Sequence, residues 1–287
     1  MRRLIFALAV IALGLGVLWA LGGLGAARAA IFDAQREFQA TLAEAVRALK
    51  AGKPGAVTGL IGLGFVYGVL HAAGPGHGKA VLGAWAFSSR ATLWRVSAIT
   101  LAASLAQATS AVALVLGGAL VFDLGREALV GIAEGPVTRA GDLVIAALGA
   151  WLVWRGLRGF WKMQATDHHH HGDACGCGHD HVPDPDAAAR AGWGEALLLI
   201  GGVALRPCTG ALFVMLLTVL IGAPLVGIAA TYAIGLGTAL LTLAVALTSA
   251  SLRDGIAGVG AGRTAHLRAF GHGAELGLGA LVIALVI

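Results

Sequence analysis

The chain has 287 residues, of which 58% are hydrophobic and only 12% are charged. Globular domains carry about 25% charged residues, so this composition excludes an ordinary water-soluble domain and predicts a membrane protein with several spanning helices. The formal net charge of +5 does not indicate nucleic-acid binding, because the basic residues flank the apolar runs, where they set membrane orientation.

The N-terminal part contains two segments of different character. Residues 1–27 carry a long apolar run after Arg3, which is either a retained transmembrane span or a signal peptide cleaved near Ala29. The run exceeds the roughly 7–15 residues usual for the apolar part of a signal peptide, and this favours a span. In residues 28–54, apolar side chains recur every three or four positions, so we expect an amphipathic helix on the outer membrane surface and a linker after it.

The remaining apolar runs predict the core of an all-α polytopic membrane protein. They occupy residues 56–87, 93–121, 142–161, 195–221, 225–250 and 270–287. Residues 55–161 form one half and residues 193–287 the other, and each half opens with a run that proline and glycine interrupt. With the N-terminus inside, most arginine-rich loops also fall inside, and the two opening runs cross in opposite directions. The expected core is therefore six transmembrane helices in two inverted three-helix halves.

The first interrupted run contains His71-Ala72-Ala73-Gly74-Pro75-Gly76-His77-Gly78-Lys79. Its Gly-Pro-Gly segment allows the chain to bend, which can bring both imidazoles to one place. Unpaired backbone and ionisable side chains are costly at membrane depth, and they are tolerated where they line a polar site. The alternative is a simple kink whose histidines bond backbone carbonyls. The pattern favours a metal pathway through His71 and His77, with Gly74, Pro75, Gly76 and Lys79 beside it.

The second interrupted run contains Arg206-Pro207-Cys208-Thr209. An arginine inside a span requires a partner or an interface, and Cys208 is either a soft metal ligand or a small apolar filler. Gln107 belongs to a polar stripe of residues 93–121 that is either pathway lining or helix–helix contact. His272 and Glu275, one turn apart, form either a pathway pair or a membrane-edge pair.

The long polar segment of residues 162–192 separates the two halves and is rich in histidine and cysteine. Such side chains suit zinc, copper, iron and nickel, and their glycine-rich spacing indicates a flexible metal-gathering loop rather than a closed site. The topology places this loop in the cytoplasm. Its candidate ligands are His168, His169, His170, His171, Cys175, Cys177, His179 and His181.

Together these motifs resemble the NicO family of nickel/cobalt transporters, and in particular its efflux members. The resemblance is carried by residues 71–79, by Arg206-Pro207-Cys208 and by the histidine-rich loop, within residues 56–287. It implies a six-span core that exports nickel and cobalt across the bacterial cytoplasmic membrane, with metal contact at His71, His77 and, less directly, Cys208. Another permease type carries a His-x-x-x-x-Asp-His signature, which the region around His71 lacks.

The expected function is secondary-active efflux of Ni²⁺ or Co²⁺, and protons are the expected counter-ion. The chain has no Walker A pattern, and imidazoles that bind either a proton or a metal ion offer a natural coupling. An uptake permease, an intramembrane thiol-redox carrier and a metal sensor without transport are the alternatives. No enzymatic activity or resident cofactor is expected, and a His-Glu-x-x-His metalloprotease motif is absent. The expected partners are divalent metal ions, protons and the lipid bilayer.

Overall fold

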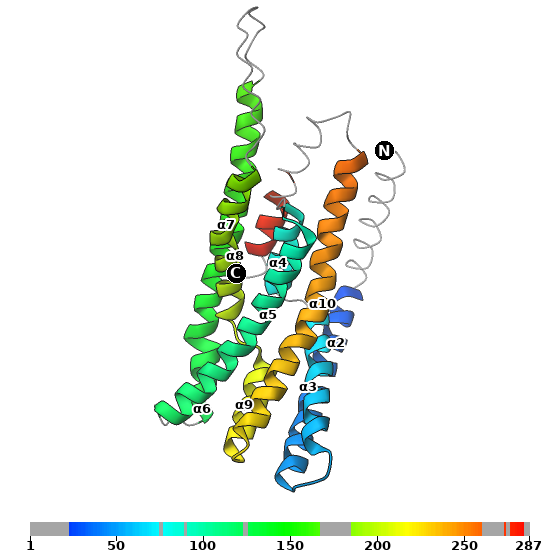
Figure 1. Cartoon of the computed structure of the whole chain (residues 1–287), viewed down its shortest axis with the longest axis vertical. Helices are drawn as coiled ribbons and strands as arrows, with labels where there is room; N and C mark the ends of the chain where they lie inside the picture. The colour runs from blue at the N-terminus through cyan, green and yellow to red at the C-terminus, as the bar shows by residue number, and fades with distance from the viewer. Residues whose placement is uncertain are drawn as a thin grey trace, which may run out of the picture.

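We analysed a computed structural model, which describes residues 23–74, 77–88, 91–122, 126–166, 185–259, 273 and 276–283. Within these ranges the secondary structure is helical, without a β-strand, as the composition predicts. The helices lie side by side in one elongated bundle (Figure 1). The expected N-terminal span at residues 4–24 lies almost entirely outside the described residues.

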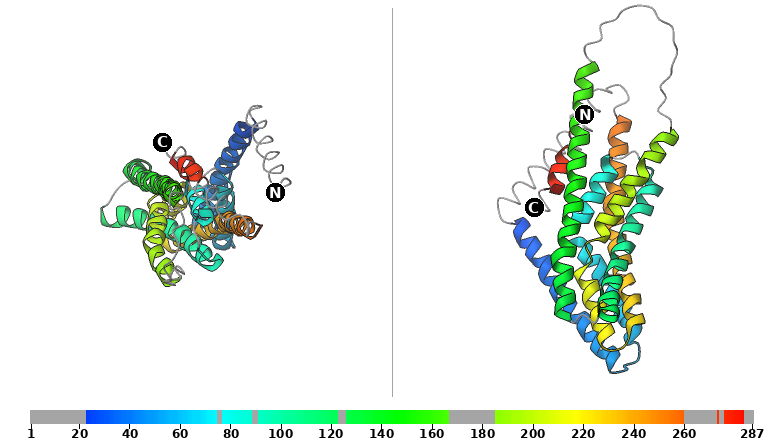
Figure 2. Two further views of the ribbon diagram at one scale, coloured as in Figure 1. Left: turned by 90° about the horizontal axis from the view of Figure 1, so that it is seen from above. Right: turned by 90° about the vertical axis from the view of Figure 1, so that its left-hand side faces the viewer.

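Helix α2, Gly23–Lys50, contains the amphipathic helix that the sequence predicts. Its apolar face packs against other helices: Leu42 and Val46 are buried against α3 (Ala56–Ala73) and α9 (Thr209–Leu220). The helix runs obliquely along the outside of the bundle (Figure 2). An apolar stripe gains more from packing against other helices than from a surface position, so α2 is part of the bundle.

The first interrupted run is divided where the sequence predicts. Helix α3 ends at Ala73, Gly74 is extended (φ −69°, ψ 160°), and α4 spans His77–Ser88. Helix α5, Leu93–Leu116, follows and continues through one π-helical turn, η1, at Gly117–Val121. The side chain of Thr92 accepts a hydrogen bond from the Arg95 amide and caps the start of α5.

Residues 126–141, which lie between the apolar runs expected at residues 93–121 and 142–161, are helical. The segments are α6 (Arg126–Ile132), the π-helical turn η2 (Ala133–Val137) and α7 (Thr138–Thr166). Pro136 lies inside η2. Proline lacks an amide donor and collides with the preceding α-helical turn, but a wider turn accommodates it without ending the helix.

The second interrupted run begins in α8 (Pro185–Ala204), which is followed by α9 at an angle of 55° and then by α10 (Pro224–Val259). Residues 276–283 are helical, whereas half of the last span predicted at residues 270–287 lies outside the described residues. In the described part of the chain, four helices are long and apolar enough to cross a membrane, or five if α8 and α9 form one bent span. The coarse prediction of a multi-span helical protein is therefore confirmed.

Glycines bring α3 and α10 into close contact. A Cβ atom at Gly68 would overlap the carbonyl of Ile234, and one at Gly237 would overlap the carbonyl of Phe65. Small residues that allow backbones to approach in this way are typical of membrane helix pairs. The two helices start from the same end of the bundle and run in the same direction, opposite to α5 and α9 (Figure 1).

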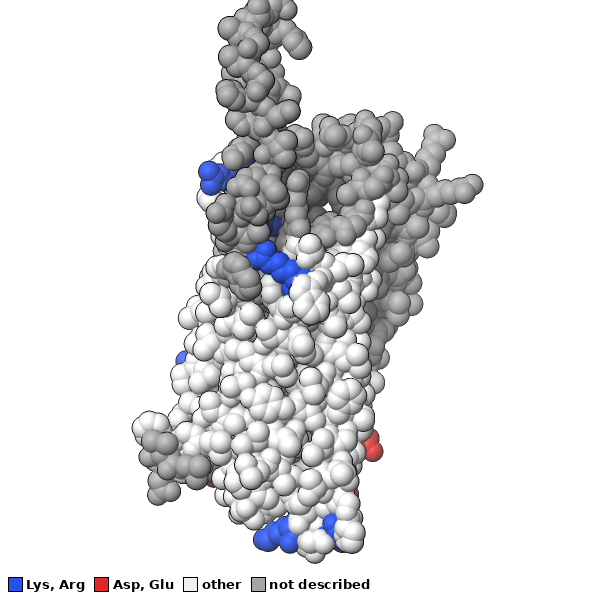
Figure 3. Space-filling model, viewed as in Figure 1, with Lys and Arg blue, Asp and Glu red and all other residues white. Residues whose placement is uncertain are grey.

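The surface agrees with a membrane position. Lysine and arginine gather toward the two ends of the visible face, and the broad band between them carries almost no charged side chain (Figure 3). A charged residue at the bilayer centre costs several kcal/mol, about 2.5–3.5 on insertion scales, so such a band is where lipid would contact the protein.

Candidate functional site

The two helix breaks meet at one cavity of about 350 Å³, which we name the central cavity. The α3–α4 break contributes His71, Ala72 and Lys79, and the α8–α9 break contributes Arg206, Pro207, Cys208 and Thr209. Further polar side chains enter from α2, α5 and α10, namely Gln35, Ser104, Gln107, Thr238 and Thr242. The structure thus brings together residues from both motifs that the sequence singled out, although their role in transport stays a prediction.

His71 lies in the last turn of α3 and lines the central cavity together with Cys208. Its imidazole stacks on the ring of Tyr67, with 5.9 Å between ring centroids and 23° between planes. It also interacts electrostatically with the thiol of Cys208, a side chain that is only 6% exposed. The Nδ1 atom of His71 is buried without a hydrogen-bond partner in the described part. An unpaired imidazole nitrogen beside a thiol is a donor pair that suits a transition-metal ion.

Cys208 also belongs to an apolar cluster with Leu60, Val214 and Ile234. Its position therefore suits both interpretations from the sequence, a soft ligand and an apolar filler. Cys208 occupies the N-cap position of α9, so the thiol lies at the point where the second break ends.

Lys79 holds the first break in place. Its Nζ donates hydrogen bonds to the carbonyls of Ala72 and Gly74, which end α3. The last carbonyls of a helix have no partner within the helix, so an ammonium group from α4 satisfies them. From the other side, Gln35 Nε2 donates to the Leu70 carbonyl at 3.4 Å. A Cβ atom at Gly74 would lie 2.8 Å from Gln35 Nε2, the end of a flexible side chain that could move aside.

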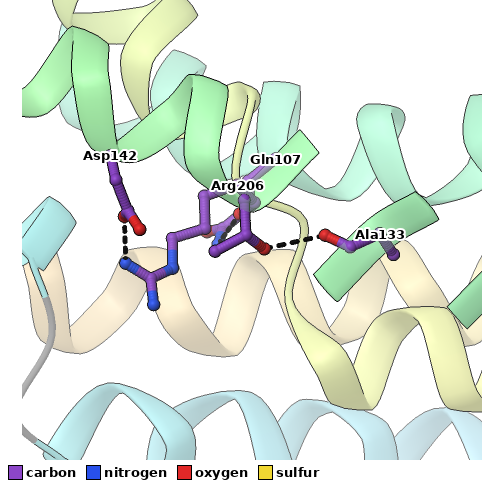
Figure 4. Close-up of polar contacts among 5 residues, drawn as sticks. Gln107, Ala133, Asp142 and Arg206 are labelled. Atoms are coloured by element: carbon purple, nitrogen blue, oxygen red, sulfur yellow. Dashed lines mark hydrogen bonds and ion pairs between the residues drawn. The ribbon is translucent and has the colours of Figure 1, made fainter. Parts of the chain in front are cut away.

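Arg206 has the partner that an arginine inside a span requires. Its Nη1 lies 2.6 Å from Asp142 Oδ1 at the start of α7, and Gln107 Nε2 donates to the Arg206 carbonyl at 2.8 Å (Figure 4). Gly141 allows this approach, since a Cβ atom there would already lie 3.2 Å from the Arg206 Cβ. The second break is therefore attached to α5 and α7 by polar contacts.

The polar contributors that the sequence did not single out include Tyr67, Asp142, Gln35, Gln39, Thr238 and Thr242. Two of them could have been suspected from the sequence. Tyr67 precedes His71 by one helical turn, and Asp142 is an acidic residue near the start of a span. The two glutamines lie on α2, which the sequence placed on the membrane surface.

The structure leaves several predicted residues without a described side chain or outside its described ranges. His77 begins α4, but its side chain is not described. Residues 75 and 76, the whole candidate ligand set of residues 168–181, and His272 and Glu275 lie outside the described ranges. Among the described residues, no three His, Cys, Asp or Glu side chains lie close enough together to hold a metal ion.

Comparison with known proteins agrees with the motifs. The NicO family model, described as a high-affinity nickel-transport protein, matches residues 57–181. A candidate nickel/cobalt efflux system of Haemophilus influenzae is 29% identical over 231 residues, which cover 74% of this chain and 71% of that protein. One of Methanocaldococcus jannaschii is 28% identical over 186 residues, which cover 63% and 72%. No solved structure matches the chain significantly. These matches confirm the resemblance of the chain to the NicO family of nickel/cobalt transport proteins.

Proposed function

We propose that this chain exports Ni²⁺ or Co²⁺ from the bacterial cytoplasm by secondary-active transport coupled to protons. The observation that carries the proposal is the meeting of two broken helices at a polar cavity, with an unpaired His71 nitrogen and the Cys208 thiol in its wall. The names of the two relatives as candidate nickel/cobalt efflux systems support the outward direction.

The path would run between two inverted halves of three helices each. In support, α3 and the α8–α9 pair are both interrupted and run in opposite directions in the bundle (Figure 1). Broken helices at corresponding positions of two halves are typical of transporters that rock around a central site. His77, six positions after His71, would add a second imidazole once the chain turns at Gly74.

Coupling follows from the ligand chemistry. A protonated imidazole cannot bind a metal ion, so the metal ion and the proton exclude each other at His71. Release of metal on the acidic outer side would load the site with a proton, which returns to the cytoplasm as the cavity reopens inward. The histidine-rich loop of residues 168–181 would collect the metal ion on the cytoplasmic side.

The test uses the purified protein in liposomes that contain a nickel-sensitive dye. If the protein exchanges metal for protons, an acidic interior accelerates Ni²⁺ entry from outside, and the exchanger nigericin abolishes that acceleration. His71→Ala and His77→Ala each remove the flux, whereas Cys208→Ser retains part of it. Equal flux with and without the pH gradient contradicts proton coupling.

The direction is tested in cells that lack their own nickel exporters. Expression of this chain should lower cellular nickel and restore growth on nickel medium, and His71→Ala should abolish both effects. Nickel accumulation on expression would identify an uptake permease instead. Complete loss of activity in Cys208→Ser, with His71→Ala still active, would indicate a thiol-redox carrier.

A further inference from the structure

A second cavity of about 210 Å³ is lined by residues of α2, α5, α6, η2 and α9. We name it the outer cavity, because α6 lies at the end of the bundle that the charge pattern assigns to the outside (Figure 1). Its wall is mostly apolar, with Leu114, Leu129, Phe213 and Leu216, and its polar contributors include Gln39 and Thr209. Thr209 also lines the central cavity, so the two cavities are neighbours.

Tyr67 lies between the two cavities. Its side chain is 0% exposed, and its ring stacks on His71 of the central cavity. Its hydroxyl accepts a hydrogen bond of 3.1 Å from Nε2 of Gln39, a residue that lines the outer cavity. The side chain of Thr209, which borders both cavities, lies near the same hydroxyl. One aromatic side chain therefore contacts the walls of both cavities.

The position of the Tyr67 ring depends on Gly210. A Cβ atom at Gly210 would lie 2.6 Å from the tyrosine oxygen and closer still to the ring carbons, so no other residue fits beneath the ring. Gly210 belongs to the first turn of α9, immediately after the second break. A change of angle at this break would therefore move the surface on which the ring rests. Helix α2, which carries Gln39, holds the hydroxyl of the same ring.

We infer that Tyr67, held by Gln39 and resting on Gly210, is the outer gate of the central cavity, and that the structure shows this gate closed. An apolar constriction excludes hydrated ions, and an aromatic ring whose hydroxyl is held by neutral side chains can move when such a contact breaks. The inference rests on the proposed function for the identity of the ion that passes. The closed gate would limit the access of external solutes to Cys208, and this access can be measured without a transport assay.

The test uses Cys208 as a reporter. The chain has three cysteines, so Cys175→Ser with Cys177→Ser leaves Cys208 alone. Spheroplasts that carry this parent protein are treated with a charged, membrane-impermeant maleimide, and the rate of Cys208 labelling is followed by mass spectrometry. We expect slow labelling of the parent. Tyr67→Phe and Gln39→Leu should each raise the rate about fivefold, the population shift that corresponds to one lost neutral hydrogen bond.

Tyr67→Ala, which removes the ring, should raise the rate further. Tyr232→Phe is the matched control, because Tyr232 is the other tyrosine of the chain and its hydroxyl, 2.9 Å from Thr109 Oγ1, borders neither cavity. This variant should label as slowly as the parent. Unchanged labelling in Tyr67→Ala, Tyr67→Phe and Gln39→Leu overturns the gate, and so does acceleration seen only in inverted vesicles. If neither the parent nor any variant transports nickel, but the variants at Tyr67 and Gln39 still label faster than the parent, the gate is supported and the proposed function fails.

Discussion

Arg206 and Asp142 form an ion pair of 2.6 Å across 64 positions of the sequence, and this pair joins the second helix break to the start of α7 (Figure 4). Their side chains are 36% and 27% exposed, so the pair is partly accessible rather than fully enclosed. Because Asp142 precedes the polar segment of residues 162–192 and Arg206 follows it, the pair connects the two parts of the chain beside the central cavity.

Replacement of Asp142 by asparagine should destabilise the protein, because it leaves the Arg206 guanidinium without a counter-charge. The breaking of a fully buried pair costs about 3–5 kcal/mol, and partial exposure reduces this to about 1–3 kcal/mol. The measurement is the free energy of unfolding in detergent or, if unfolding is irreversible, the midpoint temperature. Arg206→Gln in the same chain should recover part of the loss.

The control for this prediction is Asp33→Asn. Asp33 lies 3.8 Å from Arg36 on α2, and both side chains are more than 70% exposed. Removal of such a surface pair should cost about 0–0.5 kcal/mol. If Asp142→Asn had no more effect than Asp33→Asn, the ion pair would contribute nothing to the attachment of the second break.

Gly68→Ala should separate α3 from α10. The added methyl group would overlap the Ile234 carbonyl and approach the Thr238 amide to 3.0 Å, and both are backbone groups that cannot rotate away. Overpacking of this kind costs about 1–3 kcal/mol, and here it would also displace His71, one turn further along α3. Thermal unfolding and nickel flux should therefore both decline.

Gly62→Ala on the same helix provides the comparison. A Cβ atom at Gly62 would have no neighbour within 4 Å, so the substitution should be neutral or stabilising through helix propensity. Equal unfolding temperatures for Gly62→Ala and Gly68→Ala would mean that the α3–α10 contact is looser than the structure indicates.

The sequence predicted the broken helices well because their causes are local. Gly-Pro-Gly and Arg-Pro-Cys interrupt an apolar run through the chemistry of proline and glycine, whichever neighbours surround them. Helix α7 begins at Thr138, four positions before the apolar run expected at residues 142–161. Proline and glycine interrupt the sequence here as well, but a π-helical turn accommodates Pro136 and Gly141 contacts Arg206.

The partners within the site could not be predicted as readily. Long apolar helices have weak periodicity, because lipid-facing and protein-facing sides are both hydrophobic. The sequence therefore did not indicate that Tyr67 faces Gly210 or that Gln39 of α2 reaches Tyr67. The need of Arg206 for a partner was foreseeable, but Asp142 could be chosen only once the positions of α7 and the α8–α9 break were known.

Lys79→Met should loosen the end of α3. The substitution removes the ammonium group that bonds the carbonyls of Ala72 and Gly74, at a cost of about 1.5–3 kcal/mol for a hydrogen bond from a charged group. We expect faster amide exchange at Gly74, whose N–H donates to the His71 carbonyl at 3.3 Å, together with reduced nickel flux. Lys79→Arg should retain part of both properties.

Lys53→Met controls for the loss of a positive charge. Lys53 is exposed in the turn between α2 and α3, far along α3 from the break. Its replacement should leave amide exchange at Gly74 and nickel flux unchanged. The same exchange rate at Gly74 in Lys79→Met and in the unmodified chain would show that the carbonyls need no ammonium group.

Deletion of residues 168–181 should weaken nickel export without abolishing it. This segment holds six histidines and two cysteines, which would raise the local metal concentration at the cytoplasmic entrance, whereas the central cavity would carry the ion across. We expect the metal concentration for half-maximal flux to rise about tenfold, as the loss of a tethered binding segment predicts, with little change in the maximal rate. A loop of unchanged length in which these eight residues are serine should behave like the deletion, which separates metal binding from loop length. Loss of flux even at saturating metal in the serine loop would place an essential ligand in residues 168–181, and the central cavity would then not suffice for transport.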